Sequence, residues 1–109
     1  MDQCIFCKIV NKEIPADMIF ENEKIIVFRD INPKAPVHFL VVPKKHISSL
    51  NEIEKEDKEL FGEIFFVVKE TAKKVGVFES GYKTVINVGK GGGQEVPHLH
   101  IHLLGGWKN

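Results

Sequence analysis

Apolar residues in the middle of the chain recur with the period of an α-helix. The residues that follow one another at three- and four-residue intervals from position 54 to 75 are Leu60, Phe61, Ile64, Phe65, Val68, Ala72 and Val75. Such spacing places them on one face of a helix, and Gly76 stands where a helix C-cap belongs. The pattern therefore predicts one long amphipathic helix, and we expect Phe65 and the adjacent Phe66 to pack in the core.

Five shorter runs are rich in the β-branched and aromatic residues that favour strands. They cover positions 18–22, 24–30, 38–43, 82–88 and 97–104, and a run at 4–12 suits a short helix that Pro15 prevents from continuing. Strands that do not alternate regularly with helices indicate an α+β domain. We expect a five-stranded antiparallel sheet with one long and one short helix, and with one sheet face left open.

Length and charge narrow the class of protein. A chain of 109 residues suits a single domain that spans positions 1–109. The net charge is zero and Arg29 is the only arginine among 15 basic residues, so we expect no nucleic-acid partner. The first residues lack the apolar run of a signal peptide or membrane span, so we expect a cytoplasmic protein that does not bind membranes.

Two cysteines, Cys4 and Cys7, are separated by two residues near the start of the chain. They are too few for a disulfide framework. A Cys-x-x-Cys pair is compatible with a redox motif, with half of a metal site, or with two apolar residues of a terminal segment. The pair alone leaves these three alternatives open.

Three of the five histidines, His98, His100 and His102, alternate in one short stretch. Side chains of a strand point to opposite faces in turn, so the three rings would share one face, which we expect to look away from the core. The first and third would lie about 13 Å apart, too far for one ion. The roles open to them are a metal site made by two neighbours, a solvated polar stripe, and a nucleophile or general base.

A glycine-rich segment, Asn87 to Gln94, precedes these histidines. Its glycines at positions 89, 91, 92 and 93 allow backbone angles that point several N–H groups at one anion, which favours a phosphorus electrophile. The same composition is equally typical of a plain turn. The segment lacks the Gly-Lys-Ser/Thr of a P-loop, and a strand follows it where a dinucleotide-binding motif needs a helix.

These features together resemble the histidine triad (HIT) family, whose signature is His-φ-His-φ-His-φ-φ with φ an apolar residue. The signature stands here at positions 98–104. The segments IFCKIVNKEIPA, FRDINPKAPVHFLVVPKKHIS, VINVGKGGGQ and HLHIHLLGG follow the order and spacing of the Hint branch over nearly the whole chain. The resemblance implies a HIT-like fold and the hydrolysis of purine nucleoside phosphoramidates.

In such an enzyme, His100 would attack the α-phosphorus, expel an amine and form a nucleotidyl-histidine that water then hydrolyses. The resemblance places His102 on the leaving-group side and gives His38 the task of orienting or tuning the nucleophile. The alternative activities within the superfamily are dinucleoside polyphosphate hydrolysis and nucleotidyl transfer. A nucleotide-binding adaptor with incidental hydrolysis is the alternative from another class.

The resemblance also implies a site for a purine nucleotide. Asp30 would bind the ribose hydroxyls, because an ionised carboxylate can accept from two neighbouring donors. The residues that match the apolar base pocket are Phe6, Ile9, Phe28 and Ile31, and those that match phosphate-side positions are Asn87, Gly93 and Gln94. Glu95 stands where well-known animal members have a serine, so the role of that serine is not carried over.

Some prokaryotic members of the family hold zinc with two cysteines and two histidines. The matching residues here are Cys4, Cys7, His46 and His98, a closed set typical of a structural zinc. Members are usually homodimers, with the long helix and the strand after the glycine-rich loop at the interface. The C-terminal segment, with Trp107, would then reach toward the partner's site.

Overall fold

The computed structural model describes residues 3–108. Its helices and strands are, in chain order, α1 (Ile5–Val10), β1 (Met18–Glu21), β2 (Ile25–Arg29), β3 (Val37–Pro43), α2 (Lys58–Lys74), β4 (Tyr82–Val85) and β5 (Ile101–Gly105). Single turns of 3₁₀-helix lie at Leu50–Glu52, Lys55–Asp57 and Lys90–Gly92. None of the helices within residues 3–108 is both long enough and apolar enough to cross a membrane.

The strands form one antiparallel sheet in the order β1-β2-β3-β5-β4. The predicted α+β fold, with five antiparallel strands and with one long and one short helix, is confirmed. In the pairing of β3 with β5, His38 lies opposite Leu104 and Leu40 lies opposite His102. His38 and His102 are therefore diagonal neighbours on the same face of the sheet, within reach of each other.

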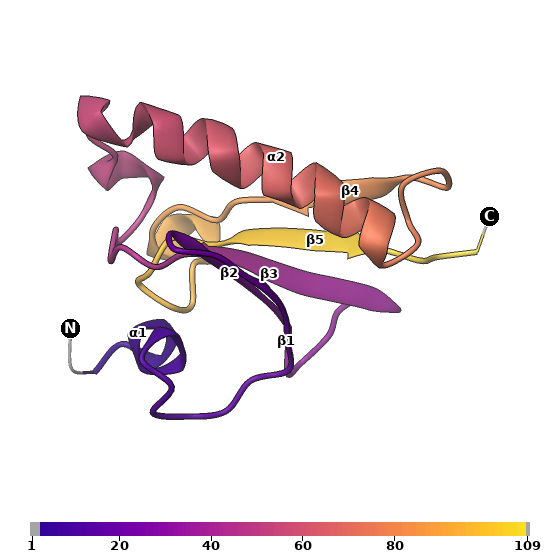
Figure 1. Cartoon of the computed structure of the whole chain (residues 1–109), viewed down its shortest axis with the longest axis horizontal. Coiled ribbons are helices and arrows are strands. Elements are labelled where there is room, and N and C mark those ends of the chain that lie inside the picture. The colour runs from indigo at the N-terminus through magenta and orange to yellow at the C-terminus, as the bar shows by residue number, and fades with distance from the viewer. Residues whose placement is uncertain (1–2, 109) are drawn as a thin grey trace.

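The two helices cover opposite faces of this sheet (Figure 1). Alternation along each strand sends Val41 and Ile101 toward α2, whereas Leu40 faces α1. The cluster beneath α2 is the larger of the two and includes Ile64 of the helix, which is 1% exposed. Truncating such a side chain to alanine would cost about 2–5 kcal/mol. The α1 cluster consists of Cys4, Phe6, Ile9, Ile26, Phe28, Leu40 and Val42.

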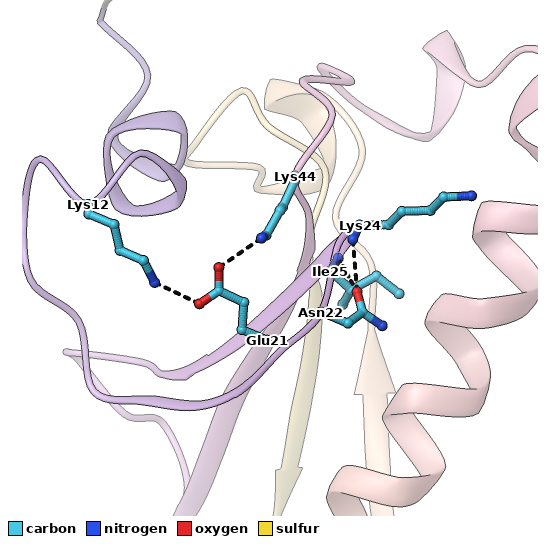
Figure 2. Close-up of polar contacts among 6 residues, drawn as sticks. All are labelled: Lys12, Glu21, Asn22, Lys24, Ile25 and Lys44. Carbon is cyan, nitrogen blue, oxygen red and sulfur yellow. Dashed lines mark hydrogen bonds and ion pairs between the residues drawn. The ribbon is translucent and has the colours of Figure 1, made fainter.

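Surface contacts tie the segment after α1 to the sheet (Figure 2). The Glu21 carboxylate accepts hydrogen bonds from Lys12 at 2.6 Å and from Lys44 at 2.7 Å. The hydrogen bond from Lys12, and to a smaller extent the one from Lys44, lower the pKa of Glu21 to about 2. In the adjoining hairpin, the Asn22 side-chain oxygen accepts the backbone N–H groups of Lys24 and Ile25, each at 2.8 Å. These two local bonds close the tight turn between β1 and β2.

Two details of the expected elements are wrong. Phe65 and Phe66 are 48% and 58% exposed, because the arc of α2 that meets the sheet runs through Leu60 and Ile64 and leaves both rings outside it. The last two strands are also shorter than predicted. β4 ends at Val85, and β5 begins only at Ile101, since the glycine-rich loop between them breaks the pairing.

Candidate functional site

The three alternating histidines do not form an open stripe. Only His102 belongs to β5, and it is half-buried, whereas His98 and His100 precede the strand and are 0% and 7% exposed. The face opposite α2 is covered here by α1. The Phe6 ring packs edge-on against the rings of His98 and His100, with centroids 5.8 and 5.1 Å away. The expectation of a face open to solvent is therefore wrong for two of the three rings.

The ring of His100 is held by the backbone. Its Nδ1 lies 2.7 Å from the carbonyl oxygen of His98, and because a carbonyl only accepts, Nδ1 carries the proton. Nε2 then has a free lone pair. No hydrogen-bond partner of Nε2 is found among residues 3–108, so its lone pair is not engaged by the part of the chain that the structure describes. Burial lowers the pKa of His100, which keeps the ring neutral.

His38 is bonded to the third histidine of the triad. Its Nε2 lies 2.9 Å from Nδ1 of His102 and 3.3 Å from Oδ2 of Asp30. Its Nδ1 accepts the backbone N–H of Lys34 at 2.9 Å, so the proton of the neutral ring is on Nε2. The direct partner of His38 is thus His102. The expected role in orienting the nucleophile would have to act through that ring.

Burial also decides the protonation of this pair. It lowers the pKa of His102 to about 4, with further lowering by His100 and His38. It lowers the pKa of His38 as well, although the negative charge of Asp30 opposes the shift. Near neutral pH the site therefore presents uncharged imidazoles.

The structure brings Cys4, Cys7, His46 and His98 together, with ligand atoms within 4.8 Å of one another. Sγ of Cys4 lies 3.3 Å from Nδ1 of His98, and Nδ1 of His46 lies 3.2 Å from both Sγ of Cys7 and Nδ1 of His98. α1 supplies Cys7 and is capped by Cys4, whose Sγ accepts the N–H of Cys7. His46 follows the C-terminal end of β3, and His98 precedes the N-terminal end of β5.

These four residues fit a metal ion. Nε2 of His98 donates to the carbonyl of Pro43 at 2.8 Å, so the lone pair of Nδ1 points into the cluster, as in histidines that bind metal. Burial and, to a smaller extent, the neighbouring Cys4 raise the pKa of the Cys7 thiol to about 11. A bound cation would therefore have to displace thiol protons.

Asp30, His38 and His102 form a second close group of possible ligands, also within 4.8 Å. Its hydrogen bonds do not suit an ion. Because Nδ1 of His38 already accepts the Lys34 N–H, a metal on Nε2 would require a ring without any proton. This group is therefore a hydrogen-bond network.

The residues expected to bind the base are not gathered in one open pocket. Phe6, Ile9 and Phe28 lie together in the α1 cluster and are only 4–6% exposed, with the two phenylalanine rings 5.5 Å apart. Ile31 stands apart and is 91% exposed. Asp30 lies beside His38, and its Oδ1 accepts the N–H of Asn32 at 2.8 Å.

The glycine-rich loop bonds mainly to itself. The N–H of Gly89 donates to Oε1 of Gln94, while those of Gly92 and Gly93 donate to carbonyls within the loop. The amide of Asn87 donates to the carbonyl of Gly92 at 2.7 Å. The Gln94 amide donates to the carbonyls of Ser48 and Val96. The N–H groups at positions 89, 92 and 93 are therefore bonded within the loop, as in the plain-turn alternative, and the side chains of Asn87 and Gln94 hold the shape of the loop.

Two groups that shape the site could not be found from the sequence. The backbone N–H of Lys34 sets the protonation of His38, and the carbonyl of Pro43 sets that of His98. Every residue offers such a carbonyl and nearly every residue such an N–H, so no side-chain pattern marks them. For the N–H of Lys34, the only signal in the sequence is the proline-rich composition of the loop at positions 31–36.

Comparisons with known proteins agree with this fold. The HIT domain family model matches residues 11–109. Protein HitA of Neisseria gonorrhoeae is 52% identical over 105 residues, which are 96% of this chain and 97% of that protein. The crystal structure of a HIT family hydrolase from Legionella pneumophila Philadelphia 1 has a TM-score of 0.95 at 50% identity and covers 97% of this chain and 95% of its own. A histidine triad protein from Clostridium difficile has a TM-score of 0.94 at 46% identity and covers 100% of this chain and 94% of its own.

Proposed function

Because the chain belongs to the HIT domain family, we propose that it is a hydrolase that releases purine nucleoside monophosphates from phosphoramidates. The observation that carries the proposal is the state of His100. Its Nδ1–H is bound to the carbonyl of His98 at 2.7 Å, which leaves the lone pair of the opposite nitrogen, Nε2, free to react. An imidazole held in this way is a nucleophile, and it forms a covalent intermediate with phosphorus.

The reaction has two displacements at the α-phosphorus. In the first, the lone pair of His100 Nε2 forms a bond to phosphorus, and the P–N bond to the leaving amine breaks. The amine keeps the bonding pair and takes a proton from the solvent. In the second, water attacks phosphorus and gives a proton to the solvent, and the bond to His100 breaks with its electron pair returning to Nε2. The carbonyl of His98 accepts from Nδ1–H throughout and stabilises the positive charge that the ring acquires in the intermediate.

The remaining polar groups suit nucleotide binding. Asp30 has two carboxylate oxygens with lone pairs beyond those facing Asn32 and His38, so it is proposed to accept from the ribose hydroxyls. His102, next to the His100 ring with centroids 4.9 Å apart, is proposed to contact the phosphate on the leaving-group side.

Zinc is the proposed ion of the Cys4, Cys7, His46 and His98 cluster, because two thiols and two imidazoles are its usual ligands. The closed ligand set leaves no position for water or substrate. When bound, zinc would stabilise the fold by joining α1 to the ends of β3 and β5. Because the ligand His98 is two residues before His100, a bound zinc ion would also fix the backbone segment that supplies the His98 carbonyl.

A comparison of substrates tests the proposed activity. Purified protein is mixed with a fluorogenic adenosine phosphoramidate and, separately, with a diadenosine polyphosphate, and kcat/KM is measured for each. We expect turnover of the phosphoramidate to exceed that of the dinucleotide by about a hundredfold or more. Preference for the dinucleotide would move the protein to polyphosphate hydrolysis. Binding of AMP without cleavage of either would instead favour an adaptor.

A further inference from the structure

The network of His38, His102 and Asp30 carries an inference that rests on the proposed function and deepens it. We infer that His38 is a positioning residue that holds His102 as a neutral ring with its proton on Nε2. It does so because the backbone N–H of Lys34 fixes the proton of His38 itself. His102 then faces the substrate with a hydrogen-bond donor and not with a lone pair.

The assignment starts at the one donor whose identity is certain. A backbone N–H can only donate, so Nδ1 of His38, 2.9 Å from the nitrogen of Lys34, must accept. The proton of the neutral His38 ring is therefore on Nε2. That atom lies 2.9 Å from Nδ1 of His102, which must accept in turn. The proton of neutral His102 is left on Nε2, the nitrogen on the opposite side of its ring.

The same contact keeps His102 uncharged. A second proton on His102 would sit on Nδ1 and would face the N–H of His38, two donors 2.9 Å apart. The N–H of His38 has one other acceptor nearby, Oδ2 of Asp30 at 3.3 Å. The other rings and charges near His102 are those of His100, Lys34 and Asp30, and only the carboxylate favours a cation. Protonation of His102 therefore requires His38 to give up its hydrogen bond to His102, which is shorter than its contact with Asp30.

A fixed N–H on His102 has a consequence for the reaction. Phosphate oxygens accept hydrogen bonds, and a lone pair on Nε2 would repel them. With its tautomer fixed, His102 contributes a hydrogen bond to the phosphate without reorienting during the displacement. Unfixed, the ring would spend part of its time with the lone pair toward the substrate.

Two variants of His38 separate donation to His102 from mere packing. The amide nitrogen of glutamine in His38→Gln occupies the place of Nε2 and can donate to His102. Asparagine in His38→Asn occupies the place of Nδ1, so it can accept from Lys34 but cannot reach His102. Both variants replace the ring by an uncharged amide.

The direct measurement is the ¹⁵N NMR spectrum of the histidine side chains in the zinc-loaded, substrate-free protein, with His102 assigned through His102→Gln. We expect the wild-type signals to show Nε2 protonated and Nδ1 unprotonated. His38→Gln should keep these shifts, and His38→Asn should move both toward those of a tautomer mixture. A proton on Nδ1 in the wild type, or unchanged shifts in His38→Asn, would overturn the inference. Because no substrate is present, this result does not depend on the proposed reaction.

A kinetic arm connects the tautomer with catalysis. Loss of one hydrogen bond should lower kcat for the phosphoramidate by about tenfold in His38→Asn, with a smaller loss in His38→Gln. Equal losses in the two variants would contradict a role for donation to His102. Failure of the wild type to cleave phosphoramidates would refute the proposed function and leave the spectroscopic result standing.

Discussion

At the scale of residues, the three triad histidines differ because each ring has a different backbone or side-chain partner. His98 donates to Pro43 and turns Nδ1 toward the cysteines, His100 donates to His98, and the partner of His102 is His38. Their alternation in the sequence indicated a special stretch. It could not assign the protons, which depend on carbonyl and amide groups that leave no mark in the sequence.

The half-buried, neutral state of His102 predicts how stability depends on pH. Its pKa is about 4 in the folded protein, below the ordinary value of 6.5, because of burial and the neighbouring His100 and His38. Between these two values the unfolded chain binds more protons than the folded one, so the free energy of unfolding falls as pH is lowered through this window. Denaturant unfolding of wild type and His102→Gln along a pH series measures the effect. The variant should show a shallower slope, and equal slopes would contradict the assignment.

At the scale of elements, local periodicity located the helices and strands well but not the exposure of individual residues. The interval pattern of α2 is confirmed, and Gly76 ends it with a φ of +85°. Phe65 and Phe66 are exposed all the same, since apolar character does not say which arc of a helix meets the sheet. The covering of the histidine face by α1 was also beyond prediction, because it depends on long-range packing.

α1 gives the prediction at this scale. Cys4 caps the helix and belongs to the proposed zinc cluster, so Cys4→Ser should reduce zinc from about one ion per chain to a small fraction and lower Tm. Elemental analysis after purification without added chelator measures the first effect and thermal unfolding the second. Ile5→Ser changes an exposed residue of the same helix and should keep the zinc. Wild-type protein free of zinc and fully active would contradict the proposed site.

At the scale of the whole molecule, the sheet order bears on the expected homodimer interface, which stays a prediction. The strand after the glycine-rich loop, β5, is paired with β3 and β4 on its two edges, so it has no free edge. The edge strand on this side is β4, before the loop. The order of the strands in the sheet could not be predicted from the five β-prone runs of the sequence alone. A homodimer that extends the sheet would therefore use β4, together with α2.

The exposed phenylalanines of α2 allow this dimer to be tested. Phe66 lines a groove with Phe20 of β1, which places it on the β1 flank. Because consecutive helical residues are about 100° apart around the axis, we expect Phe65 to lie on the other flank. We expect a dimer by light scattering, converted to monomer by Phe65→Glu, with Phe66→Glu as the matched variant that remains dimeric. A monomeric wild type, or dimers in both variants, would contradict this interface.

The claim that His100 is the nucleophile is tested with His100→Ala, with turnover and AMP binding measured on the same zinc-loaded preparation. We expect kcat for the adenosine phosphoramidate to fall by more than about a thousandfold. AMP should still bind with a Kd within about tenfold of the wild-type value, since only one contact is lost. A variant that binds AMP and retains turnover within tenfold of wild type would contradict the claim.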